Sequence, residues 1–302
     1  MFKFFRKNLF LLLCLFIFSS HATENHKNIL YEIRKENSVV GHLLGVMHAF
    51  PVGKEFSLLP STIDAVSRSD GVFTELGLSQ FLLLEKSAFE ATQTIRGNQR
   101  LSSVLPATLI SQLNTHLRPL LGDNTKELIE NTHPWAISQI LFTQLCKVRM
   151  NPVQMEAELL LLASRKEKPV MALESIQDQV NVLPAYNSPI WPEHLNAILK
   201  LIARPDCSKK YTAVLENLSD AFIAGKVDSL LPLIQESYSL IDTSKLEEVS
   251  IFSRNPQLFS RILKRVESGR FYFFAVGANH LIGPTGLISS FEKNGYIVKR
   301  IE

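Results

Sequence analysis

Residues 271–276 read FYFFAV, and this unbroken apolar run limits the folds open to the chain. A strand without polar alternation is typical of a sheet covered on both faces, as in parallel sheets flanked by helices. Apolar and β-branched runs predict further strands at residues 29–34, 39–47, 71–76, 169–173 and 296–301. Only residues 35–38 separate the first two of these runs, which therefore predict an antiparallel hairpin.

The middle of the chain has a helical pattern instead. Apolar residues recur three and four positions apart in six segments, Gln80–Thr94, Pro106–Leu117, Pro134–Lys147, Met155–Lys166, Trp191–Ile202 and Tyr211–Ala224. No Gly/Ser linker or charge block divides the 302 residues. We therefore expect one domain over residues 23–302, of the α/β (α+β) class. Its central mixed sheet would come from both chain ends, with helical inserts at about residues 80–168 and 186–243.

The first 22 residues have the pattern of a secretory signal. Three cationic side chains precede a ten-residue apolar run, which ends before Ser20-His21-Ala22, a small-x-Ala cleavage site. A helix needs about 20 apolar residues to span a bilayer, so this run is short for a membrane anchor. An uncleaved N-terminal anchor is the alternative. We expect an exported, periplasmic or secreted protein with no stable membrane span after cleavage.

Charge and cysteine content narrow the functional classes. Beyond residue 22 the acidic and basic side chains are equal in number, so the chain lacks the basic surplus of a nucleic-acid binder. Cys146 and Cys207 remain after leader removal. In an oxidising compartment they could pair, and two separate buried thiols are an equal alternative.

Four predicted strands end in an imidazole or carboxylate side chain. In chain order these are His48, Glu75, Glu174 and His280. Ligands and catalytic groups gather at the carboxyl ends of strands in α/β sheets. Such side chains are costly to bury unless they are paired, hydrogen-bonded or bound to a metal. Convergence of all four on one site explains the repeated placement.

Both histidines belong to a Gly-x-x-His tetrad, which begins at Gly45 or at Gly277. A glycine at this spacing suggests a place where backbone or ligand comes close. Two histidines and two glutamates could hold a divalent metal and activate water, or could activate water without a metal. The ligand types suit Zn, Mn or Co alike. No His-Glu-x-x-His, Gly-x-Ser-x-Gly or phosphate-binding glycine motif occurs in the sequence.

The chain resembles the TraB/GumN family at these positions. The similar segments are VGHLLGVMH at 40–48, LP at 59–60, SDGVFTE at 69–75, KPVMALE at 168–174 with Gln179, VGANHL at 276–281, GL at 286–287 and GY at 295–296. The resemblance implies membership of the Tiki-like superfamily, which includes Wnt-cleaving metalloproteases, PrgY and erythromycin esterases. It also implies an α/β core whose active site is formed by the two Gly-x-x-His motifs and the glutamates.

Carried over to this sequence, the resemblance implies an active site of His48, Glu75, Glu174 and His280. The family's late Arg-Asn pair matches Arg254 and Asn255, although Ser253 stands where the family usually has an acid. A further acidic position of the family falls on Glu156, where Asp is commoner.

Roles follow from these matches. We predict that His48, His280 and Glu75 hold the metal and that Glu174 is the general base, although the sequence does not distinguish the two glutamates. Arg254 would clamp a substrate carboxylate or pair with a glutamate of the site. Asn255 and Asn279 would bind substrate, or Asn279 would simply form a turn.

The leading hypothesis is an exported, metal-dependent hydrolase that cleaves a peptide bond, with a peptide or small molecule as substrate. One alternative is a protein that sequesters a peptide or signal without cleaving it, as the PrgY-like relatives suggest. Another is a metal-free esterase. Away from the site, His116, His133 and His194 have polar neighbours in the helical regions, and we expect them at the surface.

Overall fold

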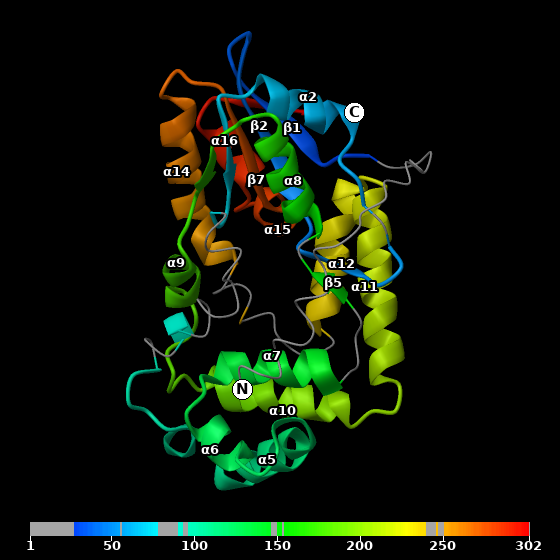
Figure 1. The fold of residues 1–302 in the computed structure, drawn as a ribbon, viewed down its shortest axis with the longest axis vertical. Helices are drawn as coiled ribbons and strands as arrows, with labels where there is room; N and C mark the ends of the chain where they lie inside the picture. Colours follow the sequence, from blue (N-terminus) through cyan, green and yellow to red (C-terminus); the bar gives the residue numbers. More distant parts are fainter. Residues whose placement is uncertain are drawn as a thin grey trace.

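The computed structural model describes residues 27–54, 56–77, 90–92, 96–145, 150–152, 154–239, 246 and 251–301 (Figure 1). The predicted leader at residues 1–22 lies outside these residues, as do Cys146 and most of the helix expected at residues 80–94. No helix within the described ranges has both the length and the apolar character needed to cross a membrane.

Among the described residues, six strands form one mixed sheet in the order β6-β4-β7-β2-β1-β8. They are β1 Leu30–Lys35, β2 Ser38–Val46, β4 Gly71–Thr74, β6 Val170–Ala172, β7 Tyr272–Gly277 and β8 Ile297–Ile301. Strands β6, β4, β7 and β2 are mutually parallel, and β1 runs antiparallel to both β2 and β8. The predicted fold class and hairpin are confirmed.

The described residues form helices α2 Pro60–Arg68, α5 Ala107–Leu121, α6 Thr125–Glu130, α7 Pro134–Leu145, α8 Gln154–Arg165, α9 Ile176–Asn181, α10 Ile190–Ile202, α11 Cys207–Ile223, α12 Val227–Ser239, α14 Asn255–Val266, α15 Ala278–Leu281 and α16 Leu287–Lys293. Helices α5, α7, α8, α10 and α11 follow predicted periodic segments to within a few residues at their boundaries, whereas the remaining helices lie outside those six segments. Short 3₁₀ turns occupy Leu101–Ser103 and Phe252–Arg254. A small ribbon of β3 (Ala49–Pro51) and β5 (Met150–Pro152), which the sequence analysis did not predict, brings residue 49 beside residue 152.

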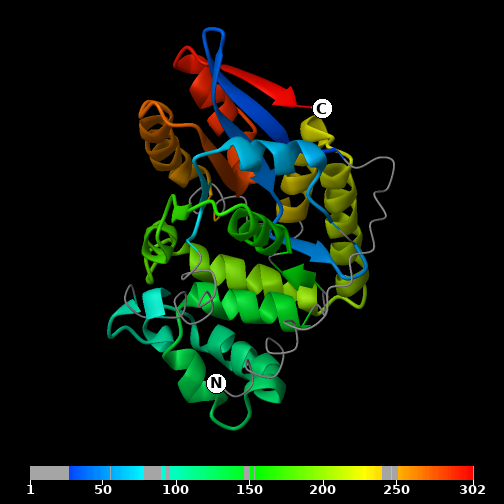
Figure 2. The ribbon, with the colours of Figure 1, turned by 45° about the horizontal axis from the view of Figure 1, so that its top comes forward.

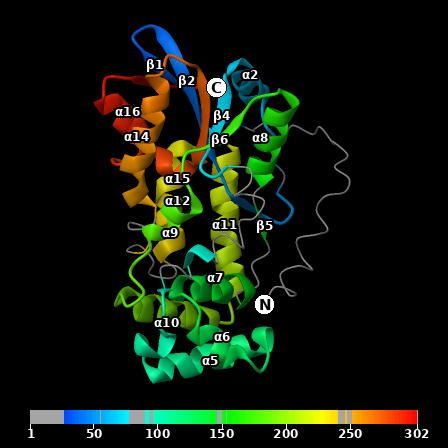
Figure 3. The same ribbon diagram turned by 60° about the vertical axis from the view of Figure 1, so that its left-hand side comes forward.

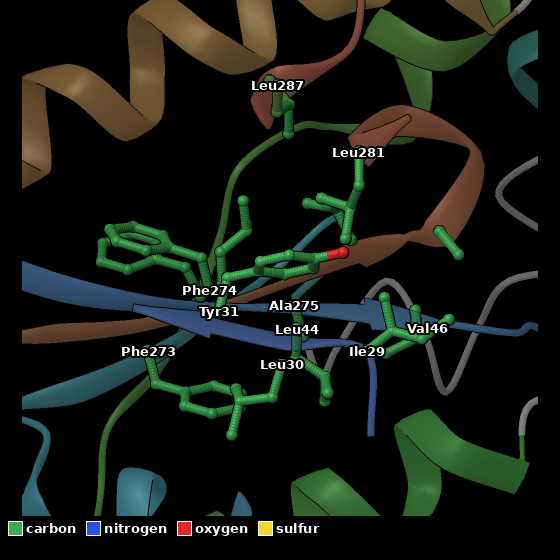
Figure 4. Packing of buried hydrophobic residues seen from close by; sticks show 14 of the residues in the cluster. Ile29, Leu30, Tyr31, Leu44, Val46, Phe273, Phe274, Ala275, Leu281 and Leu287 are labelled. Carbon is green, nitrogen blue, oxygen red and sulfur yellow. The ribbon is translucent and has the colours of Figure 1, made fainter. Parts of the chain in front are cut away.

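Helices cover both faces of the sheet, as the apolar strand at residues 271–276 predicts. In the side view α14 and α16 lie on one side of the strands, and α2 and α8 lie on the other (Figure 3). Phe274 stacks on Phe73 of the neighbouring strand, and the guanidinium of Arg265 in α14 lies over the Phe73 ring. Phe273 points to the opposite face (Figure 4). Burial on both faces explains why this strand has no polar alternation.

A second hydrophobic cluster forms at the far end of the molecule from the sheet. Helices α7 and α10 run side by side there, with α5 and α6 beyond them (Figures 1 and 2). Trp191 of α10 is fully buried in this cluster, and its indole N–H donates to the carbonyl of Ala185 at 2.8 Å. The carboxyl ends of the parallel strands point towards this helical region (Figure 3).

Two histidines of the helical region, His133 and His194, are buried, although the sequence predicted them at the surface. His133 is 0% and His194 is 6% exposed, so the prediction that they lie at the surface is wrong for both. The His133 ring packs edge-on against Tyr186 and Trp191, and its Nδ1 accepts the Trp135 backbone N–H. The polar neighbours of His133 lie just before the start of α7, whereas its burial comes from Trp191 of α10, which is far away in sequence.

These buried histidines predict acid sensitivity. Burial lowers the pKa of His133 and of His194 to about 4, against about 6.5 in an unfolded chain. Between those values only the unfolded chain binds the proton, so the free energy of unfolding falls as pH drops from 6.5 to 4. Each histidine contributes about 1.4 kcal/mol per pH unit. Urea unfolding at pH 7.5 and 5.5 should show this loss, and His133→Gln should reduce it. An unchanged pH dependence in the variant would contradict the assignment.

Candidate active site

The four strand-end residues predicted from sequence lie at one edge of the sheet. His48 follows β2, Glu75 follows β4, Glu174 follows β6 and His280 lies in α15, directly after β7. Because these four strands are parallel, their carboxyl ends meet at that edge. The Nε2 atoms of His48 and His280 lie 3.6 and 3.9 Å from Oε1 of Glu75. Glu174 joins the group through Arg254.

The glycine of each Gly-x-x-His motif makes room for the other motif. A Cβ on Gly45 would come within 2.9 Å of Ile29 and Leu281 and 3.3 Å of Ala278 in the second motif, and a Cβ on Gly277 would come within 2.9 Å of His48 Nε2 and 3.3 Å of Glu75 Oε1. Neither glycine has a positive φ, so both positions require space and not an unusual backbone conformation. The two motifs therefore fit together only because neither glycine carries a side chain.

Arg254 bridges the two glutamates. The strand pairing continues past the ends of β4 and β6, where the Glu174 N–H donates to the Glu75 carbonyl at 2.8 Å and sets the side chains next to each other. Arg254 Nη2 donates to Glu75 Oε2 at 2.6 Å and also binds Glu174 Oε2, and its Nε donates to Glu174 at 3.2 Å. Gln179 donates to both carboxylates. Of the two roles left open for Arg254, these contacts match pairing with the glutamates.

Glu75 is held in the ionised state. Desolvation would raise its pKa, but the nearby His280 and His48 side chains and the guanidinium of Arg254 hold it well below the usual value. Of these three side chains, Arg254 is the one whose charge does not depend on pH, whereas the pKa of His280 is itself lowered to about 4. The Gly277 backbone N–H also donates to Glu75 Oε1 at 2.6 Å, which fixes the oxygen that faces both histidines.

The His280 ring has a defined tautomer. Asn255 donates through Nδ2 to the Thr285 carbonyl at 2.9 Å, so its Oδ1 faces His280 Nδ1 at 2.6 Å and accepts a hydrogen bond from Nδ1–H. Burial lowers the pKa of His280 to about 4. A neutral ring with its proton on Nδ1 carries its lone pair on Nε2, the nitrogen turned towards Glu75.

His48 is bound in a different way. Its Nδ1 pairs with Oε1 of Glu156, and its side chain is 56% exposed, whereas that of His280 is only 4% exposed. Desolvation lowers the pKa of His48, but the hydrogen bond to Glu156 and the negative charges of Glu156 and Glu75 outweigh this and raise it well above the usual value. Both imidazoles thus have an acceptor on Nδ1 and direct Nε2 towards the same carboxylate oxygen.

Comparison with known proteins places the chain in a family. The sequence matches the TraB/PrgY/gumN family over residues 29–300. The chain belongs to this family. It is also similar to a protein named Metalloprotease TIKI homolog from Nematostella vectensis, with 24% identity over 332 aligned positions that cover 94% of this chain and 69% of that protein. No solved structure matches the chain.

In this TraB/PrgY/gumN chain, no three His, Cys, Asp or Glu side chains among the described residues are grouped closely enough to hold a metal ion as they stand. The separations of 3.6 and 3.9 Å between Glu75 Oε1 and the two Nε2 atoms are slightly too long. Two ligands of a tetrahedral ion with bonds of about 2.0–2.1 Å lie roughly 3.3 Å apart. Ligand spacing would require Glu75 Oε1 to come about 0.3 Å closer to His48 Nε2 and about 0.6 Å closer to His280 Nε2.

The two asparagines predicted to bind substrate, Asn255 and Asn279, differ in their surroundings. Asn255 is 1% exposed and both ends of its amide are bound within the protein, so here it orients His280. Asn279 is half-buried in α15. Their predicted substrate contacts stay predictions. The sequence alone did not reveal the hydrogen bond between Glu156 and His48, although the family resemblance had marked Glu156 as an acidic position.

The bridge predicts a large loss of stability in Arg254→Gln. Removing the guanidinium leaves two buried carboxylates without their cation, which costs about 3–5 kcal/mol. Urea unfolding at pH 7.5 measures this loss, with Arg68→Gln, from an exposed pair on α2, as the control that keeps the wild-type midpoint. The double variant Arg254→Gln/Glu174→Gln should regain part of the loss. A wild-type midpoint in Arg254→Gln would contradict the bridging role.

Proposed function

We propose that this chain is a metal-dependent hydrolase that cleaves peptide bonds, with His48, His280 and Glu75 holding the metal. The observation that carries the proposal is the convergence of two imidazole Nε2 atoms on Glu75 Oε1. Each ring has its Nδ1 bound to an acceptor, an arrangement usual for metal-binding histidines. Imidazole and carboxylate donors suit Zn, Mn or Co.

Formal charge supports a dication at this place. Three carboxylates gather here, those of Glu75 and Glu174 at the strand ends and that of Glu156 on α8. Among the described residues they face one permanent cation, Arg254, and one titratable partner, His48. A buried excess of negative charge is unfavourable unless a counter-charge accompanies it. The space beside Gly277, where a Cβ would meet both His48 and Glu75, lies next to the three donor atoms.

A divalent metal bound here would polarise a substrate carbonyl and lower the pKa of a water molecule. The protein would contribute the fixed orientation of the donors: the Gly277 N–H fixes Glu75 Oε1, and Asn255 fixes the His280 ring. Glu174 was predicted as the general base, and that role remains a proposal. Its side chain is 0% exposed and bound to Arg254, so these contacts favour an anchoring role for Glu174 at rest.

Two further observations bear on substrate and compartment. The similar protein from Nematostella vectensis is named a metalloprotease, which supports a peptide bond as the target. Cys207 is bonded in a disulfide, and disulfides persist mainly in oxidising compartments. This bond supports export to the periplasm or the exterior, in agreement with the predicted leader. Cys146, its candidate partner, lies outside the described residues.

The proposal predicts metal-dependent cleavage that both histidines support. The purified protein should cleave members of a peptide library, and mass spectrometry should detect the new peptide termini. A chelator should abolish them, and Zn²⁺, Mn²⁺ or Co²⁺ should restore them. His48→Ala and His280→Ala should each reduce cleavage at least 100-fold, with the apo protein still folded by circular dichroism. His116→Ala, in the far helical region, is the matched control and should cleave like wild type.

The other outcomes distinguish the alternatives. Cleavage that resists the chelator would favour a metal-free hydrolase, and peptide binding without cleavage would favour sequestration. Full activity in either histidine variant would remove this site from the mechanism.

A further inference from the structure

Helix α8 begins beside the first Gly-x-x-His motif. The Met47 backbone N–H donates to the Met155 sulfur at 3.3 Å, so the residue before His48 is tied to the first turn of the helix. Met155 and Leu159 are buried and fix this turn against the core. Glu156 leaves the helix between these two anchors, and its side chain is 12% exposed. The helix thus holds a carboxylate in a defined place next to His48.

The two oxygens of Glu156 differ in their contacts. Oε1 pairs with His48 Nδ1, whereas Oε2 is buried and has no hydrogen-bond partner among the described residues. A buried carboxylate oxygen without a partner is unfavourable. The contact with His48 is therefore the interaction that accounts for the position of this side chain.

The orientation of the His48 ring depends on its contact with Glu156 more than the orientation of the His280 ring depends on its contact with Asn255. The His280 side chain is 4% exposed, so packing and Asn255 together fix its ring. The His48 side chain is 56% exposed, so packing restrains it far less. Glu75 lies 3.6 Å from Nε2, too far for a hydrogen bond that would orient the ring.

We propose that Glu156 is a positioning residue that holds the His48 ring with Nε2 turned towards Glu75 and keeps a proton on Nδ1. The proposal rests on the proposed function, because the purpose of this orientation is metal binding by Nε2. A carboxylate on the far nitrogen fixes the ring and increases the basicity of the metal-binding nitrogen, whereas Asn255 supplies only a neutral acceptor to His280. The two histidines would then be unequal ligands, and metal affinity would depend on Glu156 although it does not touch the metal.

The positioning role of Glu156 is tested by comparing the metal affinity of the full wild-type chain with that of Glu156 variants. Zn²⁺ binding is measured by competition with a chromophoric chelator, and Co²⁺ binding by visible absorption. Glu156→Gln keeps a neutral acceptor and should weaken binding about 10-fold, and Glu156→Ala should weaken it towards 100-fold. Glu158→Gln is the matched control: Glu158 lies on the same helix but accepts the Leu58 N–H at 3.2 Å, so affinity should stay within about threefold of wild type. Equal affinity in wild type and Glu156→Ala would overturn the proposal.

A second readout needs no metal. In protein labelled with ¹⁵N-histidine, the wild-type His48 ring should show a hydrogen-bonded Nδ1–H, and Glu156→Ala should lose that signal while His280 is unchanged. Circular dichroism confirms that the variant folds. An unchanged His48 signal would overturn the role of Glu156. If wild type shows the Glu156-dependent signal but binds no metal, the proposed function fails while the positioning role stands.

Discussion

The guanidinium of Arg254 is the interaction on which the rest of the site depends. Two buried carboxylates at the ends of neighbouring parallel strands would repel each other. The pairing of β4 with β6 fixes their backbone positions side by side, so the two residues cannot move apart. Arg254 contacts both, and it can do so because a short 3₁₀ turn before α14 carries it to the same edge of the sheet. This arrangement leaves Glu75 with one oxygen bound to Arg254 and the other facing the histidines.

Parallel strand order explains how residues far apart in sequence reach the same place. Strand β7 lies between β4 and β2, so the residues that follow it meet those that follow both neighbours. The glycines of the two motifs then allow close contact, since each leaves space for a side chain of the other. Helices α14 and α16 cover one face of the sheet, and α2 and α8 cover the other (Figure 3). The geometry of the site is thus a product of the whole sheet.

The strands of the sheet and the four strand-end residues of the site could be predicted from sequence, because each strand is a recognisable apolar run. The apolar run at residues 271–276 indicates a strand buried on both faces, and a strand followed at once by His or Glu marks a site edge. Apart from the β1–β2 hairpin, the order of the strands could not be predicted, because the remaining runs have no short connection that fixes which of them pair. The partners of Arg254 depend on that order, so the sequence left two roles open. His133 shows the same limit, since its burial comes from Trp191, which lies on another helix.

The most direct test of the account is a crystal structure of the protein grown with Zn²⁺, with anomalous diffraction recorded on both sides of the zinc edge. The account predicts an anomalous peak within about 2.3 Å of His48 Nε2, His280 Nε2 and Glu75 Oε1, with the Arg254 bridge in place. Bound zinc elsewhere, with these three side chains turned away from one another, would contradict it.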